Sequence, residues 1–339
     1  MKLMKKIVVV ALLLVVVAVA GTGFVVYRTF LMPTGRLTEP IVVVVGEGDT
    51  LSETARELEE KGAILNERLF VTVTRYLGVD RLIRVGEYQI DPTMSPKDIL
   101  VMLLKGHVVE YPVTVPEGLN IYQVGDLLAE KGFGERDEFI RLAQDKEFIA
   151  SFGLEAVTLE GYLFPDTYRV TKGMREPEII TLMVNRFSEV FSEEKEKAKA
   201  GDTLTDYERL ILASIIEKET GAPEERPLVS AVFTNRIKKG MKLDSCATVI
   251  YGIWDRFDGN LTERDLSTWT SYNTYMNSGF PPGPICNPGR ASIAAAITPA
   301  DADYLFFVSK NDGTSHFSST LSEHNRAVYE YQILKKNRK

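Results

Sequence analysis

An uncharged apolar span near the N-terminus constrains this chain more than any other feature. Residues 7–26 read IVVVALLLVVVAVAGTGFVV, without a single charged side chain. A helix of this length is about 30 Å long, which matches the hydrocarbon core of a bilayer. Three lysines precede the span, and lysine-rich flanks stay on the cytoplasmic side of a membrane. We therefore predict a cytoplasmic tail at residues 1–6, a transmembrane helix at 7–27 and an exported remainder, since no second hydrophobic span follows.

A cleaved signal peptide is the alternative interpretation of the same span. Ala18-Val19-Ala20 resembles the small-residue motif that precedes a signal-peptidase cleavage site. The apolar run continues for six residues beyond Ala20, which is longer than the hydrophobic region of a signal peptide requires. The sequence therefore favours a retained anchor, and a mature N-terminus at Gly21 would contradict it.

Charge and the rarity of metal ligands exclude two classes of protein. The first 36 residues hold five basic and no acidic residues, and the remaining 35 basic and 47 acidic residues leave a net charge of −12. An acidic exported part does not suit binding to a phosphate backbone, so we expect no nucleic-acid partner. The two cysteines form no CxxC motif and the three histidines form no close ligand pair, so we expect no metal site.

The exported part begins with a pattern of short strands and helices. Residues 28–40 contain two prolines and no periodicity, which predicts a stalk. Residues 41–112 follow, with strands predicted at 41–45 and 86–90. Helices are predicted within 47–62, capped by Asp49 or Thr50 and ended by Gly62, and from Pro96 to Leu104. The strand–helix–helix–strand order and the GDTL pattern from Gly48 resemble a LysM-like glycan-binding module. A small α+β packing domain without a ligand would give the same pattern.

A second strand–helix unit occupies residues 113–158 together with a connector. Its segment 117–132 shares six of 16 positions with segment 47–62 when the two are aligned without gaps. An internal β–α repeat explains this identity, and convergence on the chemistry of a strand–turn–helix is the alternative. Helices are further predicted within 136–199, at 206–220, 228–237 and 292–297 and from residue 321, with a strand at 304–309. The region after Gly240 is rich in loops, and the fold class is α+β.

Two acids at the end of the helix predicted at 206–220 are candidates for catalysis. Glu217, Lys218 and Glu219 follow the apolar run ILASII. A carboxylic acid in a partly apolar setting has a raised pKa, which a general acid needs at neutral pH. Ala213 and Ser214 lie beside Glu217 on a helix and would leave room for a substrate. A solvated helix end is the alternative, and spacing does not choose between the two acids.

Aromatic and polar side chains gather in the predicted loops and at helix ends. Sugars are recognised by aromatic faces together with Asn, Asp and Arg hydrogen-bonding groups, and functional residues concentrate in loops. The pattern favours a carbohydrate groove, whereas core packing would explain each aromatic residue taken alone. The residues concerned are Tyr162, Phe164, Tyr168, Tyr251, Trp254, Trp269, Tyr272 and Tyr275, with Asp166, Asn235, Arg236, Asp244 and Asn273.

Seven motifs in one order resemble the YceG-like family, the endolytic murein transglycosylases. They are LEGYLFPDTY from Leu159, ASIIEKET from Ala213, VFTNRI from Val232, TVIYG from Thr248, SYNTY from Ser271, GFPPGPICNPG from Gly279 and HFSSTLSEHN from His316. The resemblance spans the whole chain. It implies an N-terminal anchor, a LysM-like α+β module and a mixed α/β catalytic domain at residues 159–336. It also implies a lytic transglycosylase of the bacterial cell membrane that cuts nascent peptidoglycan strands internally and so terminates their elongation.

The resemblance also implies a set of site residues. Glu217, as the first Glu of the EKET motif, would protonate the MurNAc–GlcNAc glycosidic oxygen and then accept the proton of the MurNAc C6 hydroxyl, which gives a 1,6-anhydro end. Lys218 is expected to point away from the site, because a nearby cation would lower the pKa of that acid. Neither metal nor cofactor is required. The expected substrate-binding residues are Asp166, Tyr168, Asn235, Arg236, Tyr251, Asn273 and Tyr275.

Two other functions and one covalent link remain open at this stage. A hydrolytic muramidase would use the same acid with Asp166 or Asp244 as a partner, and a non-catalytic glycan-binding scaffold would have its acid outside any groove. Cell-wall synthases (penicillin-binding proteins) are the expected protein partners. An exported chain with two cysteines favours a disulfide between Cys246 and Cys286, with two small buried thiols as the alternative.

Overall fold

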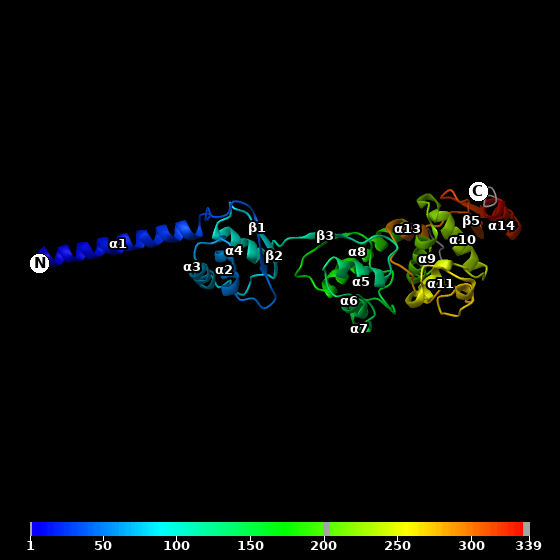
Figure 1. Cartoon of the computed structure of the whole chain (residues 1–339), viewed down its shortest axis with the longest axis horizontal. Helices are drawn as coiled ribbons and strands as arrows, with labels where there is room; N and C mark the ends of the chain where they lie inside the picture. The colour runs from blue at the N-terminus through cyan, green and yellow to red at the C-terminus, as the bar shows by residue number, and fades with distance from the viewer. Residues whose placement is uncertain (1, 199–203, 335–339) are drawn as a thin grey trace. The chain divides into compact units, whose positions relative to one another are not determined.

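The chain folds into two compact units. The computed structural model describes residues 2–198 and 204–334 (Figure 1). Unit 1 comprises Met1–Tyr111 with Arg169–Met174, and unit 2 comprises Pro112–Tyr168 with Arg175–Lys339. Unit 2 therefore contains most of two segments that were predicted to be separate, residues 113–158 and residues 159–336.

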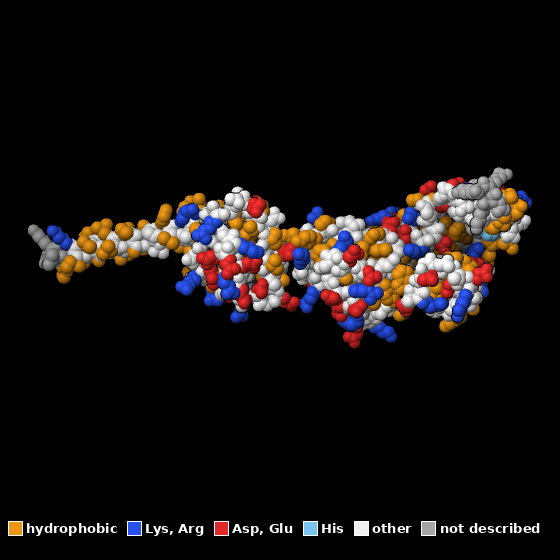
Figure 2. Space-filling model, viewed as in Figure 1, with side chains coloured by type: hydrophobic (Ala, Val, Ile, Leu, Met, Phe, Trp, Pro, Cys, Tyr) orange, Lys and Arg blue, Asp and Glu red, His pale blue; other side chains and the backbone are white. Residues whose placement is uncertain are grey.

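Helix α1 (Lys2–Phe30) contains the apolar span. Within the described residues it is the one helix that is long and apolar enough to cross a membrane, and its most apolar stretch is not buried against the rest of the chain. Figure 2 shows hydrophobic side chains along the visible face of this helix. A signal sequence would have the same composition, so anchor and signal peptide both stay predictions.

The segment predicted as a stalk packs against unit 1. Phe30 is buried at the end of α1, with its ring centroid 6.1 Å from that of Phe70. The Thr34 hydroxyl donates a hydrogen bond of 2.8 Å to the carbonyl of Gly62. Apolar burial and this hydrogen bond hold residues 30–37 in place. The sequence does not predict this packing, because the segment has no periodic pattern.

Unit 1 has a two-stranded antiparallel sheet covered by short helices. Its elements are β1 (Ile41–Val45), α2 (Leu51–Glu60), α3 (Glu67–Tyr76), β2 (Gly86–Ile90) and α4 (Pro96–Lys105). The strands pair from Ile41 opposite Ile90 to Val45 opposite Gly86. Val43 and Tyr88 are fully buried in the core. The predicted strands at 41–45 and 86–90 are confirmed with these bounds.

Unit 2 is mainly helical. Because the chain combines these helices with two-stranded sheets, the predicted α+β class is confirmed. Two-stranded sheets join β3 to β4 and β5 to β6. The region after Gly240 holds the short helices α11 and α12, and β6 completes a hairpin with the predicted strand; the sequence analysis had assigned none of these three. The elements are β3 (Tyr111–Thr114), α5 (Ile121–Glu130), α6 (Arg136–Ala143), α7 (Lys146–Ser151), β4 (Thr167–Val170), α8 (Glu176–Lys195), α9 (Asp206–Glu219), α10 (Arg226–Lys238), α11 (Cys246–Gly252), α12 (Glu263–Leu266), α13 (Arg290–Ile297), β5 (Phe306–Ser309), β6 (Ser315–Ser318) and α14 (Leu321–Val328).

Helices α2 and α5 have the same local structure, as the shared residues of segments 47–62 and 117–132 suggest. Each has ten residues and begins with a capping box, at Thr50 and Asn120. Each is followed by a glycine with positive φ, Gly62 at 81° and Gly132 at 77°. The cap at Thr50 is one of the two that the sequence predicted.

Helix α9 runs through the core of unit 2 and positions the predicted catalytic motif. A capping box at Thr205 starts the helix, and every residue from Arg209 to Ile216 is buried. The helix packs against α10 and α13. Because an all-round buried helix can expose polar groups only at its ends, Glu217 to Glu219 come to lie where α9 leaves the core.

Candidate active site

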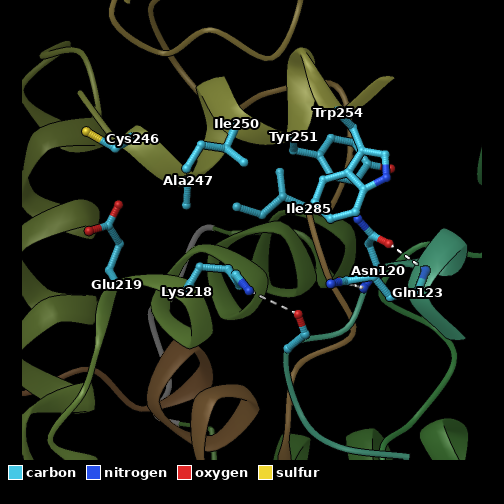
Figure 3. Close-up of a pocket in the computed structure, with 11 residues that line it drawn as sticks. Asn120, Gln123, Lys218, Glu219, Cys246, Ala247, Ile250, Tyr251, Trp254 and Ile285 are labelled. Carbon is cyan, nitrogen blue, oxygen red and sulfur yellow. Dashed lines mark hydrogen bonds between the residues drawn. The ribbon is translucent and has the colours of Figure 1, made fainter. Parts of the chain in front are cut away.

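A cavity of about 200 Å³ opens beside the C-terminal end of α9, and we call it the Trp254 cavity (Figure 3). In this view Glu219 and Cys246 lie at one end, and Asn120, Gln123 and Trp254 lie at the other. Its walls combine apolar and aromatic surface with amide and charged groups, the mixture that binds a sugar. The lining residues are Gly118, Asn120, Gln123, Lys218, Glu219, Cys246, Ala247, Ile250, Tyr251, Trp254 and Ile285.

The Glu219 carboxyl group is held at the start of α11. Its Oε1 accepts a hydrogen bond of 2.5 Å from the Ser245 hydroxyl, and the backbone N–H of Ala247 also binds the carboxyl. Burial raises the pKa of Glu219, although these two hydrogen bonds and the charge of Arg236 act in the opposite direction. A carboxyl group with a raised pKa has a larger protonated fraction at neutral pH, which suits a proton donor.

A second cavity, of about 500 Å³, shares Glu219 and Cys246 with the first, and we call it the Arg236 cavity. Because both cavities have the same carboxyl group in their walls, a chain of sugars that occupied both would pass beside it. The remaining lining residues are Phe233, Arg236, Leu243, Asp244, Tyr275, Phe306, Phe307, Leu321, His324 and Asn325.

Glu217 lines neither cavity. Its Oε2 accepts a hydrogen bond of 2.9 Å from the backbone N–H of Gly289, the residue that caps α13. Its Oε1 lies 3.4 Å from a guanidinium nitrogen of Arg226, and the Glu217 side chain is only 7% exposed. Residues two apart on a helix point to different sides, so α9 directs Glu217 toward α13 and Glu219 toward the cavities.

Lys218 lines the Trp254 cavity, whereas the sequence analysis expected it to point away from the catalytic site. Its Nζ donates a hydrogen bond of 3.2 Å to the carbonyl of Gly118. This carbonyl belongs to the segment that precedes α5 and fixes the lysine at the cavity wall. The expectation assumed Glu217 as the acid, and the nearby backbone acceptor was not visible from the sequence.

Three of the predicted substrate-binding residues line the cavities. Tyr251 lines the Trp254 cavity, and Arg236 and Tyr275 line the Arg236 cavity. The Arg236 guanidinium donates to the carbonyls of Lys242, Leu243 and Leu305 and pairs with Asp244 at 3.1 Å. These bonds fix the loop before α11, so Arg236 shapes its cavity as well as lining it.

The other four predicted substrate-binding residues line neither cavity and hold backbone or ion-pair partners. Asp166 pairs with Arg186 at 2.9 Å. The buried Tyr168 donates to the carbonyl of Phe164. Asn235 donates to the carbonyls of Ala302 and Tyr304, and Asn273 donates to those of Leu266 and Thr268. Three of these side chains therefore satisfy main-chain carbonyls of their own unit, and the fourth, Asp166, neutralises an arginine.

The predicted disulfide is wrong, because both cysteines are free. The exposed Cys246 has its Sγ 3.2 Å from the Tyr275 hydroxyl. Cys286 is fully buried, and its thiol donates to the carbonyl of Ser214. An even cysteine count in an exported chain predicts pairing only when the fold brings the two residues together.

The sequence analysis did not identify several residues of the site. Asn120 and Gln123 form the capping box of α5, and only the fold shows that they also line a cavity. Ser245 precedes a helix that was not predicted. Glu160 lies within the quoted LEGYLFPDTY motif, but only the structure shows its buried carboxyl group bonded to Tyr251, Ile121 and Asn287.

Comparison with known proteins decides the family. The model of the YceG-like family matches residues 43–330. This chain belongs to the YceG-like family. An endolytic murein transglycosylase of Bacillus subtilis is 31% identical over 95% of this chain and 93% of its own length.

Two further YceG-like relatives support this membership. An endolytic murein transglycosylase of Streptococcus pneumoniae strain D39 is 28% identical over 88% of this chain and 59% of its own length. The crystal structure of a YceG-like protein from Listeria monocytogenes is 30% identical. It superposes with a TM-score of 0.57 and covers 85% of this chain and 99% of its own.

Proposed function

We propose that this chain is an endolytic murein transglycosylase, which cleaves peptidoglycan strands internally and leaves 1,6-anhydroMurNAc ends. The observation that carries the proposal is the position of Glu219 in the walls of two neighbouring cavities. The near full-length similarity to the Bacillus subtilis transglycosylase supports the same activity.

The proposed reaction uses one carboxyl group twice. Protonated Glu219 gives its proton to the glycosidic oxygen between MurNAc and GlcNAc as the C1–O bond of MurNAc breaks. The resulting carboxylate takes the proton from the C6 hydroxyl of the same MurNAc, and that oxygen bonds to C1. No water is consumed, and the acid ends in its starting protonation state. Because the nucleophile belongs to the substrate, a second carboxylate at a fixed distance is not required.

Geometry and resemblance favour different acids of the EKET motif. The resemblance implies Glu217, which stays a prediction from sequence. The proposal takes Glu219, because it combines cavity access with a pKa raised by burial. An ion pair with Arg226 and a hydrogen bond from Gly289 instead give Glu217 the contacts of a structural carboxylate.

Cavities on two sides of the acid suit cleavage within a strand. Sugars before and after the broken bond could both be bound, one set in each cavity. Tyr251 and Trp254 offer aromatic faces in one cavity, and Arg236, Tyr275 and His324 offer polar groups in the other. Within this proposal, Tyr251, Arg236 and Tyr275 touch the glycan. Asp166, Tyr168, Asn235 and Asn273 support it only by holding loops.

Product analysis tests the proposed reaction. The purified protein is incubated with uncrosslinked glycan strands, and the new ends are identified by mass spectrometry. The proposal expects 1,6-anhydroMurNAc ends in products of internal cleavage. Reducing MurNAc as the sole new end would replace the lyase with a hydrolytic muramidase, for which Asp244 in the Arg236 cavity is the available second carboxylate.

The finer features of location and partners are part of the same proposal. We propose that α1 is a retained single-pass anchor with its N-terminus in the cytoplasm, which the preceding lysines support. Residues 41–90 have the strand–helix–helix–strand order of a LysM-like module, and a role in binding glycan is proposed for them. An anchored enzyme acting on nascent strands would work beside penicillin-binding proteins, which co-purification from solubilised membranes tests.

A further inference from the structure

Glu160 is a buried carboxyl group that lies outside both cavities and takes no part in the proposed reaction. Only 1% of the residue is exposed. Its Oε2 accepts hydrogen bonds from the Tyr251 hydroxyl at 2.9 Å and from the backbone N–H of Ile121 at 3.2 Å. Its Oε1 lies 3.4 Å from the side-chain nitrogen of Asn287.

One of these three donors lines the Trp254 cavity, and the other two lie close to its lining residues in separate segments. Tyr251 itself lines the cavity from α11. Ile121 is the first residue of α5 and follows the lining residue Asn120. Asn287 lies two residues after the lining residue Ile285, and its backbone N–H donates to the carbonyl of Leu119 at 2.8 Å. One buried carboxyl group therefore connects segments that lie up to 166 positions apart in the sequence.

We propose that Glu160 is a positioning residue for glycan binding, which sets the orientation of Tyr251 and the spacing of the cavity walls without touching the sugar. The inference rests on the proposed function in taking a glycan as the ligand. Tyr251 would carry most of the effect, because it is the group that Glu160 contacts and that also reaches the cavity.

The protonation state of Glu160 gives this role a measurable signature. Burial raises the pKa of Glu160 to about 8, so the group is mainly neutral at pH 7. When Glu160 is neutral, its O–H can donate to the Tyr251 hydroxyl, which reverses that hydrogen bond, because the backbone N–H of Ile121 and the side-chain nitrogen of Asn287 can only donate. Above pH 8 the carboxyl group of Glu160 ionises while it is buried. The free-energy cost of this buried charge disfavours the arrangement in which the three segments surround it.

The titratable groups around Glu160 do not interfere with this signature. They are Tyr122 of α5, Tyr251 of α11, and Tyr272 and Cys286 of the following loops. Burial raises the pKa of each of these groups, so all four remain neutral near pH 8. Glu217 and Lys218 of α9 also act electrostatically on the Cys286 thiol.

The experiment measures binding of a GlcNAc–MurNAc tetrasaccharide between pH 6 and 9 by calorimetry, in a Glu219→Gln background that does not cleave. With Glu160 present, we expect the Kd to rise severalfold with an inflection near pH 8. Glu160→Gln, which keeps the shape and cannot ionise, is expected to bind within about threefold of its parent at pH 7 and to lack the inflection. Tyr251→Phe should raise the Kd about three- to tenfold, since it removes one hydrogen bond.

Further variants separate positioning from a general effect on folding. In the Tyr251→Phe background, Glu160→Gln should produce no additional change in Kd, because Glu160 acts through that hydroxyl. Glu194→Gln is the matched control, a buried carboxylate of unit 2 that pairs with Arg290 and Lys197 and lines neither cavity. It should leave the tetrasaccharide Kd unchanged.

The inference is overturned if the inflection persists in Glu160→Gln, or if Glu160→Gln raises the Kd of the Tyr251→Phe protein. Failure of the proposed function would look different. The wild-type protein would then bind the tetrasaccharide with the expected pH dependence and yet release no anhydro ends.

Discussion

Glu217 and Glu219 are the same side chain two residues apart on α9, yet the fold gives them different partners. The α13 side of the helix end provides Glu217 with a backbone N–H and a guanidinium, which hold its carboxyl group in place. The cavity side provides Glu219 with a hydroxyl, a backbone N–H and two spaces for ligand. The comparison teaches that a catalytic acid is recognised by its surroundings, and that a motif alone leaves two candidates.

The largest expected effect is that of Glu219→Gln on cleavage. The amide keeps the size of the side chain and cannot transfer a proton, so kcat on uncrosslinked glycan strands should fall by about 10²–10⁴-fold or more. Glycan binding measured by calorimetry should change little. Wild-type turnover in this variant would remove Glu219 from the reaction and return the role to Glu217.

Glu217→Gln is the matched variant on the other side of the helix. The amide still accepts from Gly289 but no longer neutralises Arg226, so we expect a loss of about 1–3 kcal/mol in unfolding free energy. The kcat of the folded variant should stay within about tenfold of wild type. The resemblance to the family predicts the opposite, an abolished kcat with stability retained. Denaturant titration and strand-cleavage assays on the same preparation decide between them.

Ser245→Ala sharpens the comparison through the pH profile. The Ser245 hydroxyl stabilises the ionised form of Glu219, and its removal should raise the pKa of that acid further. Activity requires the protonated acid and therefore falls as the pH rises through this pKa. The falling limb of kcat/KM against pH should move to higher pH in Ser245→Ala, whereas Glu217→Gln should leave it in place.

The smallest effect concerns the thiol that lies beside the acid. Cys246→Ser keeps a small polar group near Tyr275, and we expect kcat to change by less than about threefold. Quantitative thiol labelling of unfolded, unreduced protein should find two free thiols. A single disulfide in that assay would contradict the structure and restore the covalent link that the sequence favoured.

Local features of the fold follow from the sequence with good accuracy. The valine-rich run at 41–45 and the alternation at 86–90 give strands with the predicted bounds, and the predicted helix at 206–220 matches α9 within one residue. Helix α11 escaped prediction because its seven residues, including Gly252, are too few for a periodic pattern. The backbone carbonyls to which Asn235 and Asn273 donate could not be predicted, because a sequence does not show which carbonyls need a donor.

The sequence by itself determined the apolar N-terminal span, the α+β class, the membership in a family through ordered motifs, and a carboxylic acid at the end of a buried helix. These features depend on neighbouring residues, through hydrophobic periodicity, capping and turn chemistry. The tertiary structure alone decided which acid faces a cavity, that Cys246 and Cys286 stay apart, and that Glu160 joins three segments around a site. Each of these depends on contacts between residues far apart in the chain, where burial and hydrogen bonding set pKa and access.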